Sequence, residues 1–363
     1  MYKSIGFIGL GLIGGSIARA LRECCPNSRI IAYSRKTLLA GDIAEALHAN
    51  VIDDAVFSLQ ALSECDIVFL CAPVDANLTY IEKLSEILKP DALLTDVGSV
   101  KSAICERAAE FGLSARFIGG HPMTGSERTG FTSSSALLLE NAFYALTVPA
   151  DFPKERLDRF VALVNEMKAI PVVLDPTVHD GAVSAISHVP HLIAAQLVNL
   201  VRTAPDSDVC QTLAAGGFKD ITRIASSSPT LWEGILSSNK AFVLPTLDRY
   251  IRLLQEARDA LSSDRTDEIA ADFYEAGRFR SSLGDHKGVL PESFLLYADI
   301  KDEAGAIATF ANLLASNGIS LKNIGIVHNR EFERGVLRME FYDKKSRSAA
   351  TEVFSRAGFS YTL

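Results

Sequence analysis

The 363-residue chain has few cysteines, the residues whose disulfide bonds stabilise small exported proteins. It holds six cysteines, and no two of them form a Cys-x-x-Cys pair. Several lie in apolar runs, so we expect reduced, buried thiols and neither a disulfide framework nor a zinc site. The cysteines are Cys24, Cys25, Cys65, Cys71, Cys105 and Cys210.

Positive charge, long apolar runs and targeting signals are also scarce. The chain has 36 lysines and arginines against 44 aspartates and glutamates, a formal net charge of -8, which argues against nucleic-acid and anionic-membrane partners. We expect no membrane span, because no apolar run is long enough, and a cytoplasmic location, because the N-terminus lacks a basic leader. With 48% hydrophobic residues the chain can bury a substantial core, and its length allows two or three domains.

Residues 1–174 alternate short apolar runs with amphipathic stretches. The runs have the length of strands, and between most of them lie helical patterns such as NLTYIEKLSEIL at 77–88. This alternation predicts an α/β domain with a mainly parallel sheet covered by helices on both faces. The predicted strands are SIGFIGL, RIIAY, DIVFLCA, ALLTDV, RFIGG, FYALTV and, last, IPVVLD at 170–175.

Residues 175–283 change character, because no convincing strand occurs among them. Asp175 and Pro176 predict a helix start, with an N-cap acid followed by proline at the first helical position. The helices that follow are too apolar to stand apart in water, so we expect an intertwined all-α domain that forms a homodimer. A linker containing Gly, Pro and Ser, 284–293, precedes a small α+β unit at 294–363 with the predicted order βαββαβ.

The stretch GFIGLGLIGGS near the N-terminus holds Gly9, Gly11 and Gly14 in the spacing Gly-x-Gly-x-x-Gly, with Leu12 and Ile13 between the last two. Glycines in this spacing give a tight turn, close approach of the backbone to a pyrophosphate, and close helix–strand packing. Alone the spacing is a weak signal, but here it lies between a predicted strand and a predicted helix. The pattern therefore predicts a site for NAD or NADP at the N-terminus of that helix.

The segment after the second predicted strand bears on the choice of coenzyme. Where an NAD site usually places Asp or Glu for the ribose hydroxyls, the chain has Ser34, Arg35 and Lys36. A guanidinium and an ammonium suit a ribose 2′-phosphate, which an acid would repel. These residues favour NADP over NAD; the alternative is a solvated basic turn.

Polar residues also gather where ligands bind in such folds. Ser99 and Lys101 follow a predicted strand, at the carboxyl edge of the sheet. His121 lies in GGHPMTGSERTG (119–130), which has the period of neither a helix nor a strand. A histidine in such a loop is more often functional than structural.

Three further histidines lie at the start of the helical region. His179 precedes Asp180, and SHVPH places His188 and His191 three residues apart. Zinc is the rival explanation for such a cluster, but no acid or thiol stands at ligand spacing, so we predict no metal. For His179 and His188 we favour a structural role, and for His191 function and structure are equally supported.

Taken together, these segments resemble the prephenate/arogenate dehydrogenase family of tyrosine biosynthesis. The resemblance rests on GLGLIGGS, DVGSVK, GGHPMTGSERTG, HD with SHVPH, and GGFKDITRIASSSPTLW, which follow the family's order from residue 5 to about 232. It implies a Rossmann-type nucleotide-binding domain and an all-α dimerisation domain. It also implies oxidative decarboxylation of prephenate to 4-hydroxyphenylpyruvate and CO2, with hydride transfer to NAD(P). Arogenate, which would give tyrosine directly, is the alternative substrate.

The resemblance also implies roles for individual residues. His121 is similar to the catalytic histidine that bonds the substrate C4 hydroxyl, and Ser99 to the serine beside that hydroxyl and the nicotinamide. Arg223 is similar to the arginine that holds a substrate carboxylate. Glu127 matches an acid near the mouth of the pocket, and His191 a histidine that lines it. Further substrate-binding candidates in matching segments are Ser126, Gly217 and Lys219.

Residues 294–363 resemble an ACT domain, a small amino-acid-sensing module of the ferredoxin-like βαββαβ type. The resemblance rests on DIKDEAGAIATFANLLASNGISLKNIGIVHN, in which Gly305, Asn317 and Asn323 match the family pattern. It implies regulation by an amino acid, and tyrosine, the pathway product, is the expected effector. The alternative is a domain of this fold that only aids assembly.

Two other interpretations stay open. A dehydrogenase of the 3-hydroxyacid or 6-phosphogluconate type would share the architecture, but those enzymes use a lysine as the principal acid–base group and lack the His-Pro-Met and Ser-His-x-Pro-His segments. A non-catalytic sensor would combine the dinucleotide fold with the amino-acid module. Such a sensor would not need His121, Ser99 and Arg223 together, so we expect an enzyme.

Overall fold

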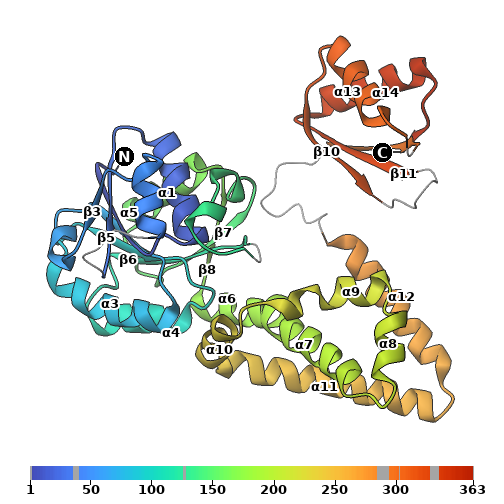
Figure 1. Ribbon diagram of the computed structural model, residues 1–363, viewed down its shortest axis with the longest axis horizontal. Coiled ribbons are helices and arrows are strands. Elements are labelled where there is room, and N and C mark those ends of the chain that lie inside the picture. The colour runs from blue at the N-terminus through green and yellow to red at the C-terminus, as the bar shows by residue number, and fades with distance from the viewer. Residues whose placement is uncertain are drawn as a thin grey trace. The chain divides into compact units, whose positions relative to one another are not determined.

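The computed structural model describes residues 2–35, 41–125, 128–283, 294–301, 303–327 and 335–362 (Figure 1). The chain divides into two compact units, Met1–Ser262 and Ser263–Leu363. The first unit contains the glycine-rich segment and all the histidines discussed above. The predicted boundaries between three domains stay a prediction.

The first unit is built on one sheet that, within the described residues, has eight strands in the order β3-β2-β1-β4-β5-β6-β7-β8. Neighbouring strands are parallel except β6 and β7, which are antiparallel. The predicted strands are confirmed, and the three-residue β3 was not predicted. The strands are β1 (Ser4–Ile8), β2 (Arg29–Tyr33), β3 (Asp54–Val56), β4 (Ile67–Leu70), β5 (Leu93–Asp96), β6 (Phe117–Pro122), β7 (Phe143–Thr147) and β8 (Ile170–Leu174).

Helices cover both faces of this sheet, as Figure 1 shows. Apolar side chains of α1 (Leu12–Cys24) and α5 (Lys154–Glu166) pack on one face, where α2 (Asp42–His48) also lies. Those of α3 (Val74–Ile87) and α4 (Ser102–Glu110) pack on the other. Central strands between two helical layers have both faces buried, which is why their sequences are continuous apolar runs. Short 3-10 turns lie at Leu59–Leu62, Phe131–Ser133 and Ala136–Leu138.

The rest of the first unit is helical, as predicted. Asp175 caps the first helix: its carboxylate accepts hydrogen bonds from the backbone N–H groups of Thr177 at 2.8 Å and Val178 at 3.3 Å. The elements are α6 (Pro176–Val183), the π-helical turn η4 (Ser184–His188), α7 (Val189–Arg202), α8 (Ser207–Leu213), α9 (Gly216–Thr222), the 3-10 turn η5 (Arg223–Ser226), α10 (Pro229–Ser238) and α11 (Lys240–Ser262).

The segment from α6 through η4 to α7 forms one helical rod, Pro176–Arg202, of 27 residues. By length and composition it could cross a membrane, which corrects the expectation that no segment is long and apolar enough. The rod carries His179, Asp180 and His188, which are buried and hydrogen-bonded inside the unit. Within the described chain, 28% of the rod's most apolar window is buried.

The second unit begins with α12 (Thr266–Ser282) and continues with an antiparallel sheet in the order β10-β11-β9-β12. Two helices cover this sheet and bury Phe310 and Phe354 against it. The predicted βαββαβ order is confirmed. Its elements are β9 (Phe294–Ile300), α13 (Ala306–Ser316), β10 (Leu321–Val327), β11 (Gly335–Phe341), α14 (Lys344–Ala357) and β12 (Tyr361–Thr362).

Candidate active site

The glycine-rich turn lies between β1 and the N-terminus of α1. Gly9 has φ +95°, and a Cβ there would lie 2.8 Å from the carbonyl carbon of Cys71. A Cβ on Gly14 would lie 2.5 Å from the Gly9 carbonyl oxygen. At Gly11, by contrast, no described atom lies within 4 Å of the added Cβ. The turn is thus closed on its protein side and open where a pyrophosphate would approach, so these residues fit a dinucleotide.

The first N–H groups of α1 point out of this turn. Gly11 is the N-cap of α1, and its position leaves the N–H groups of Leu12 and Ile13 outside the i→i−4 ladder of the helix. These groups and the positive end of the helix dipole favour a bound phosphate.

Ser34 and Arg35 follow β2 at the same edge of the sheet. Strands β1 and β2 are parallel, with Ile8 paired to Tyr33, so the two carboxyl ends lie side by side. Arg35 is exposed and Ser34 partly exposed. Lys36 lies outside the described residues.

Ser99 and His121 also lie at this carboxyl edge. Strands β5 and β6 are parallel, with Thr95 paired to Ile118, and Ser99 stands just beyond the end of β5. His121 is the next-to-last residue of β6, where it pairs with Ala145 of β7, which corrects the expectation that it lies in a loop. Both side chains are partly exposed, so both can meet a ligand bound at the edge.

His121 is the first member of a hydrogen-bonded chain of three side chains. Its Nδ1 lies 2.9 Å from Nε2 of His179, and Nδ1 of His179 lies 2.8 Å from Oδ1 of Asp180. The Asp180 carboxylate also accepts the backbone N–H groups of Lys101 at 2.8 Å and Ser102 at 2.7 Å. The N-terminus of α4 therefore holds the far end of the chain in place.

This chain fixes the tautomers of both histidines. Burial raises the pKa of Asp180, but hydrogen bonds from His179, Ser102 and Lys101 outweigh it and lower that pKa. The ionised carboxylate only accepts, so Nδ1 of His179 carries the proton and its Nε2 is an acceptor. His121 must then donate from Nδ1, which leaves the lone pair on its Nε2. That nitrogen, directed away from His179, can accept a proton from a ligand.

The surroundings of His121 also keep it neutral. Burial, then the positive charge of Lys101, then the neighbouring His179 lower its pKa well below the usual value. Lys101 is fully buried and forms an ion pair with Asp96, and its Nζ donates to the Gly120 carbonyl at 2.7 Å. The ion pair thus ties the ends of β5 and β6 together directly beneath His121.

Asn239 carries the network from α6 toward the other histidines. Its Nδ2 donates to the Asp180 carbonyl at 3.0 Å and lies 2.9 Å from Nδ1 of His188. A carbonyl can only accept, which fixes the orientation of the amide, so Nδ1 of His188 is an acceptor. Burial lowers the pKa of His188 to about 4, in keeping with a neutral ring.

His191 lies one turn farther along α7. Trp232 stacks on its ring, with centroids 3.8 Å apart and 27° between the planes, and meets His188 edge-on. Nδ1 of His191 lies 2.8 Å from the Ser187 carbonyl and donates to it, so Nε2 is left as an acceptor. Burial lowers the pKa of His191, and so does the charge of Arg223.

Three of the predicted substrate-binding residues lie on elements that pack against α7. Arg223 is the first residue of η5, which packs against α7, and its side chain is exposed. It lies close enough to His191 for its positive charge to lower the pKa of that ring. Gly217 and Lys219 are exposed residues of α9, which also packs against α7. Ser126 and Glu127 lie outside the described residues.

Several residues of the network were not foreseen. A structural role was favoured for His179, yet it contacts the candidate catalytic histidine directly. Asn239 and Trp232 were not singled out, because neither residue forms a motif with its sequence neighbours that signals a site. The Asp96–Lys101 pair spans five residues across a strand end, a spacing that also occurs by chance.

Comparisons with known proteins agree with this arrangement. The family model described as "Prephenate dehydrogenase, nucleotide-binding domain" matches residues 17–173. The model described as "Prephenate dehydrogenase, dimerization domain" matches residues 175–275. Together they span the sheet except β1, the histidine network and Arg223.

The chain is also similar to individual relatives. It is 36% identical to a prephenate dehydrogenase of Bacillus subtilis, over 97% of this chain and 95% of that one. The crystal structure of A. aeolicus prephenate dehydrogenase with hydroxyphenyl propionate and NAD+ matches with TM-score 0.72 and 29% identity, over 77% of this chain and 98% of that one. The Synechocystis arogenate dehydrogenase structure matches with TM-score 0.69 and 31% identity, over 77% and 99%. On these matches the chain belongs to the prephenate dehydrogenase family.

Proposed function

We propose that the protein oxidises prephenate with NAD(P)+ to 4-hydroxyphenylpyruvate and CO2, in tyrosine biosynthesis. The observation that carries this proposal is the His121–His179–Asp180 chain at the carboxyl edge of a dinucleotide-binding sheet. It supplies one neutral imidazole with a free lone pair beside the expected place of the nicotinamide. The 36% identity of this chain to a prephenate dehydrogenase, over nearly the whole length of both, supports the same substrate.

The residues of the site match the chemistry of that substrate. Bound NAD(P)+ supplies the acceptor for the hydride that leaves C4. His121 Nε2 accepts the proton of the C4 hydroxyl as the oxygen becomes carbonyl-like, and Ser99 bonds the same oxygen. The ring then loses CO2 and becomes aromatic, which makes the reaction effectively irreversible. A general base of this kind contributes about 10²–10⁴-fold to the rate.

Prephenate carries two carboxylates, which need cationic and polar partners. Arg223 can hold one of them in a bidentate pair. His191 Nε2 and Lys219 offer further polar contacts, and Gly217 leaves room beside them. Ser126 and Glu127 belong to the segment that follows His121 and complete the proposed substrate-binding set.

For the coenzyme we propose a preference for NADP. Arg35 stands after β2, where an acid would serve the ribose hydroxyls of NAD. The A. aeolicus relative was solved with NAD+, so NAD is the alternative. Steady-state kinetics with each coenzyme decide between them. If Arg35 binds the 2′-phosphate, Arg35→Ala raises the KM for NADP and leaves that for NAD nearly unchanged.

Arogenate is the second candidate substrate, because one similar solved structure is an arogenate dehydrogenase. The two compounds differ in a keto or amino group on the side chain, away from the hydride. The direct test is NADPH or NADH absorbance after addition of each purified substrate. Absence of coenzyme reduction with both would contradict the proposal.

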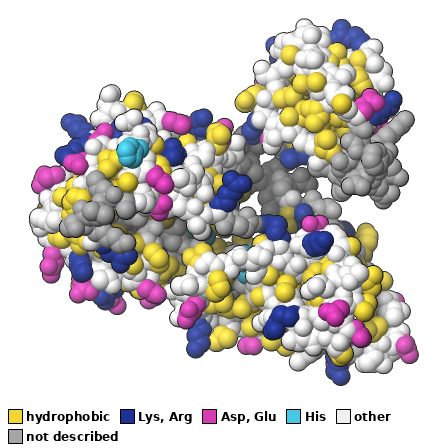
Figure 2. Space-filling model, in the orientation of Figure 1, with side chains coloured by type: hydrophobic (Ala, Val, Ile, Leu, Met, Phe, Trp, Pro, Cys, Tyr) yellow, Lys and Arg dark blue, Asp and Glu magenta, His cyan; other side chains and the backbone are white. Residues whose placement is uncertain are grey.

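We propose that the protein works as a homodimer through its helical segment. Exposed large apolar side chains there include Leu200 on α7 and Leu244, Leu253 and Leu254 on α11. Figure 2 shows hydrophobic side chains, in yellow, spread over the visible face of these helices. A surface of this kind is typical of an interface, and the match to a dimerisation domain supports a partner of the same chain. Light scattering of the purified protein tests this.

We further propose that the βαββαβ sheet of the second unit is an ACT domain that binds tyrosine. The relatives solved in structures match 77% of this chain, whereas the Bacillus subtilis relative matches 97%. We expect such a difference in coverage if a regulatory domain is joined to a catalytic part that all these relatives share. Gly305, with φ +89°, caps α13, and Asn317 caps its other end. Asn323 lies at a register shift in β10.

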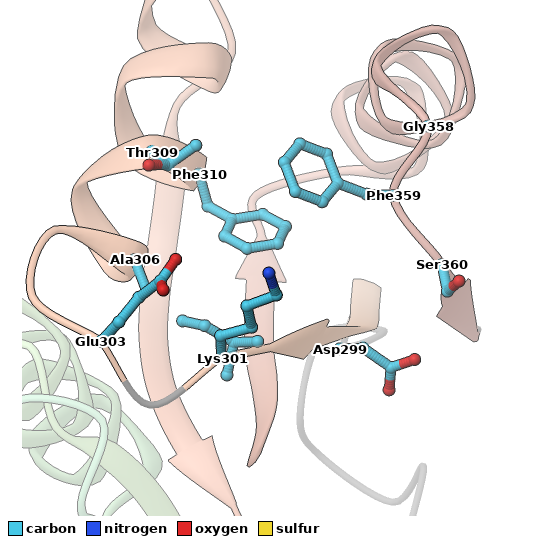
Figure 3. Close-up of a pocket in the computed structure, with 10 residues that line it drawn as sticks. Asp299, Lys301, Glu303, Ala306, Thr309, Phe310, Gly358, Phe359 and Ser360 are labelled. Atoms are coloured by element: carbon cyan, nitrogen blue, oxygen red, sulfur yellow. The ribbon is translucent and has the colours of Figure 1, made fainter. Parts of the chain in front are cut away.

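A cavity of about 340 Å³ in this domain supports an amino-acid ligand. Figure 3 shows Asp299, Lys301 and Glu303 around it, with the rings of Phe310 and Phe359. Carboxylates and an ammonium complement the two charges of a free amino acid, and the rings, 4.5 Å apart, suit an aromatic side chain. Gly305 precedes Ala306, which lines the cavity. Asn317 and Asn323 are not among the residues that line it.

Titration of activity with tyrosine tests the regulatory proposal. We expect inhibition of the full chain, and loss of that inhibition in Lys301→Ala, which removes the partner of the ligand carboxylate. Inhibition that persists unchanged in this variant would move the effector to another site. No inhibition of the full chain would remove tyrosine as the effector.

A further inference from the structure

The ends of two helices meet on one face of the nucleotide-binding sheet, away from the catalytic edge. Cys24 is the last residue of α1, Cys25 follows it, and Glu166 is the last residue of α5. One ligand atom of each, the two sulfurs and a carboxylate oxygen, lies within 4.8 Å of the others. Since α1 starts at the carboxyl edge and runs back across the sheet, this group lies at the opposite edge from His121.

The spacing of the two sulfurs matches what a tetrahedral metal needs. The Cys24 and Cys25 Sγ atoms are 3.6 Å apart. Two sulfurs bound to one tetrahedral Zn²⁺, each at about 2.3 Å, lie about 3.8 Å from each other. Glu166 is exposed, so a rotation of its side chain can bring an oxygen to bonding distance without moving the backbone.

A cavity next to the group gives room for an ion and a fourth ligand. It measures about 160 Å³ and is lined in part by Glu23, Cys24, Glu140, Glu166 and Lys168. Three acids thus face one lysine, and the lysine Nζ is 3.7 Å from a Glu140 oxygen. The remaining negative charge attracts a cation, and Glu23 or a water can complete four-coordination.

We propose that Cys24, Cys25 and Glu166 bind a thiophilic divalent cation, Zn²⁺ or Cd²⁺, which joins the end of α1 to the end of α5. The expectation of no metal rested on the missing Cys-x-x-Cys pairs and on histidines without an acid or thiol at ligand spacing. Two adjacent cysteines with an acid from a distant helix form no such motif, so spacing alone does not reveal the site. Bound metal would stabilise the first unit by linkage.

The test is a Cd²⁺ titration of the reduced, metal-free full chain, followed by ultraviolet thiolate-to-metal charge transfer and by thermal unfolding. We expect a band that saturates at one ion per chain and a higher unfolding temperature. Cys24→Ser should raise the Kd by at least about 100-fold, since loss of even an outer partner costs about 10–100-fold. Glu166→Gln should raise it by about tenfold. Cys210→Ser, which removes a partly exposed thiol elsewhere, is the matched control.

Two results would overturn the proposal. One is no charge-transfer band in the unaltered chain at Cd²⁺ concentrations that saturate ordinary thiolate sites. The other is a band whose Kd is the same in Cys24→Ser and in Cys210→Ser. Glu166 is exposed, so Glu166→Gln is expected to fold and keeps the test decisive if Cys24→Ser does not.

Discussion

Nδ1 of His121 and Nε2 of His179 lie 2.9 Å apart, although the two residues are 58 positions apart in the chain. The contact joins strand β6 of the nucleotide-binding sheet to α6, the first helix of the helical region. Because Asp180 holds the second ring, the first ring can present only Nε2 to a substrate. The site is therefore assembled from both halves of the first unit.

Replacement of His121 by asparagine removes the proposed base and keeps a side chain of similar polarity. We expect kcat with prephenate to fall by about 10²–10⁴-fold. Coenzyme affinity should stay nearly unchanged, because the glycine-rich turn is built from other residues. Turnover equal to that of the unaltered enzyme would exclude His121 as the base.

His179→Phe keeps a ring in the same space but removes the acceptor for His121 Nδ1. A lost buried hydrogen bond of about 1–3 kcal/mol corresponds to a fall in kcat of roughly 5- to 150-fold. We expect the KM values for prephenate and coenzyme to change little, since His179 is buried behind His121. A purely structural role would instead show as a lower unfolding temperature with unaltered kcat.

The acid limb of activity should lie below pH 6.5. His121 must be neutral to accept a proton, and burial with the nearby Lys101 charge lowers its pKa well below the ordinary value. Hence kcat/KM, which reports the free enzyme, rises through that lowered pKa and is flat from about pH 6.5 upward. A limb with a midpoint at or above about 6.5 would indicate a different titrating group.

Folding stability should fall in mild acid because of His188. Its pKa is lowered to about 4 by burial, whereas in the unfolded chain it is near 6.5, so the unfolded state binds the proton first. The contribution of neutral His188 to the free energy of unfolding is therefore complete above about pH 6.5. It is lost as the pH falls toward about 4, by about 3 kcal/mol in all. Urea unfolding at several pH values measures it. His188→Asn, which still offers Asn239 an acceptor, should flatten the dependence.

Arg223→Ala should raise the KM for prephenate more than it lowers kcat, because a lost carboxylate partner weakens binding in the ground state and the transition state alike. A factor of about tenfold to 100-fold corresponds to a charge-assisted hydrogen bond of about 1.5–3 kcal/mol. Arg202→Ala, on the exposed end of α7, is a matched control for loss of positive charge. Equal KM values in the two variants would contradict the assignment.

Most of the fold could be predicted from the sequence, because its signals are local. Central strands such as β1 and β4 are covered on both faces and therefore appear as unbroken apolar runs. Asp175 and Pro176 mark the start of α6 by their own chemistry. Strand β3 has three residues, one of them an exposed aspartate, which is too short for any period to show.

The candidate site was predictable only in part, because its contacts join distant positions. His121 stands out because it lies in a glycine-rich stretch without helical or strand period, but no residue near His179 in the sequence indicates that the two rings touch. Asn239 is one of several polar residues where α10 meets α11, and only the folded chain brings its amide to Asp180 and His188. Long-range contacts of this kind leave no spacing in the sequence.

The π-helical turn at Ser184–His188 has a consequence for how the enzyme can change. Such a turn holds one residue more than an α-helical turn, so it accommodates an extra residue while the helix on either side keeps nearly the same orientation. Loss of the exposed Ala185 would let the turn wind as a regular α-helix, and we expect it to be tolerated. Loss of a residue inside α7 would instead rotate the rest of that helix by roughly 100° and turn its apolar stripe in a new direction.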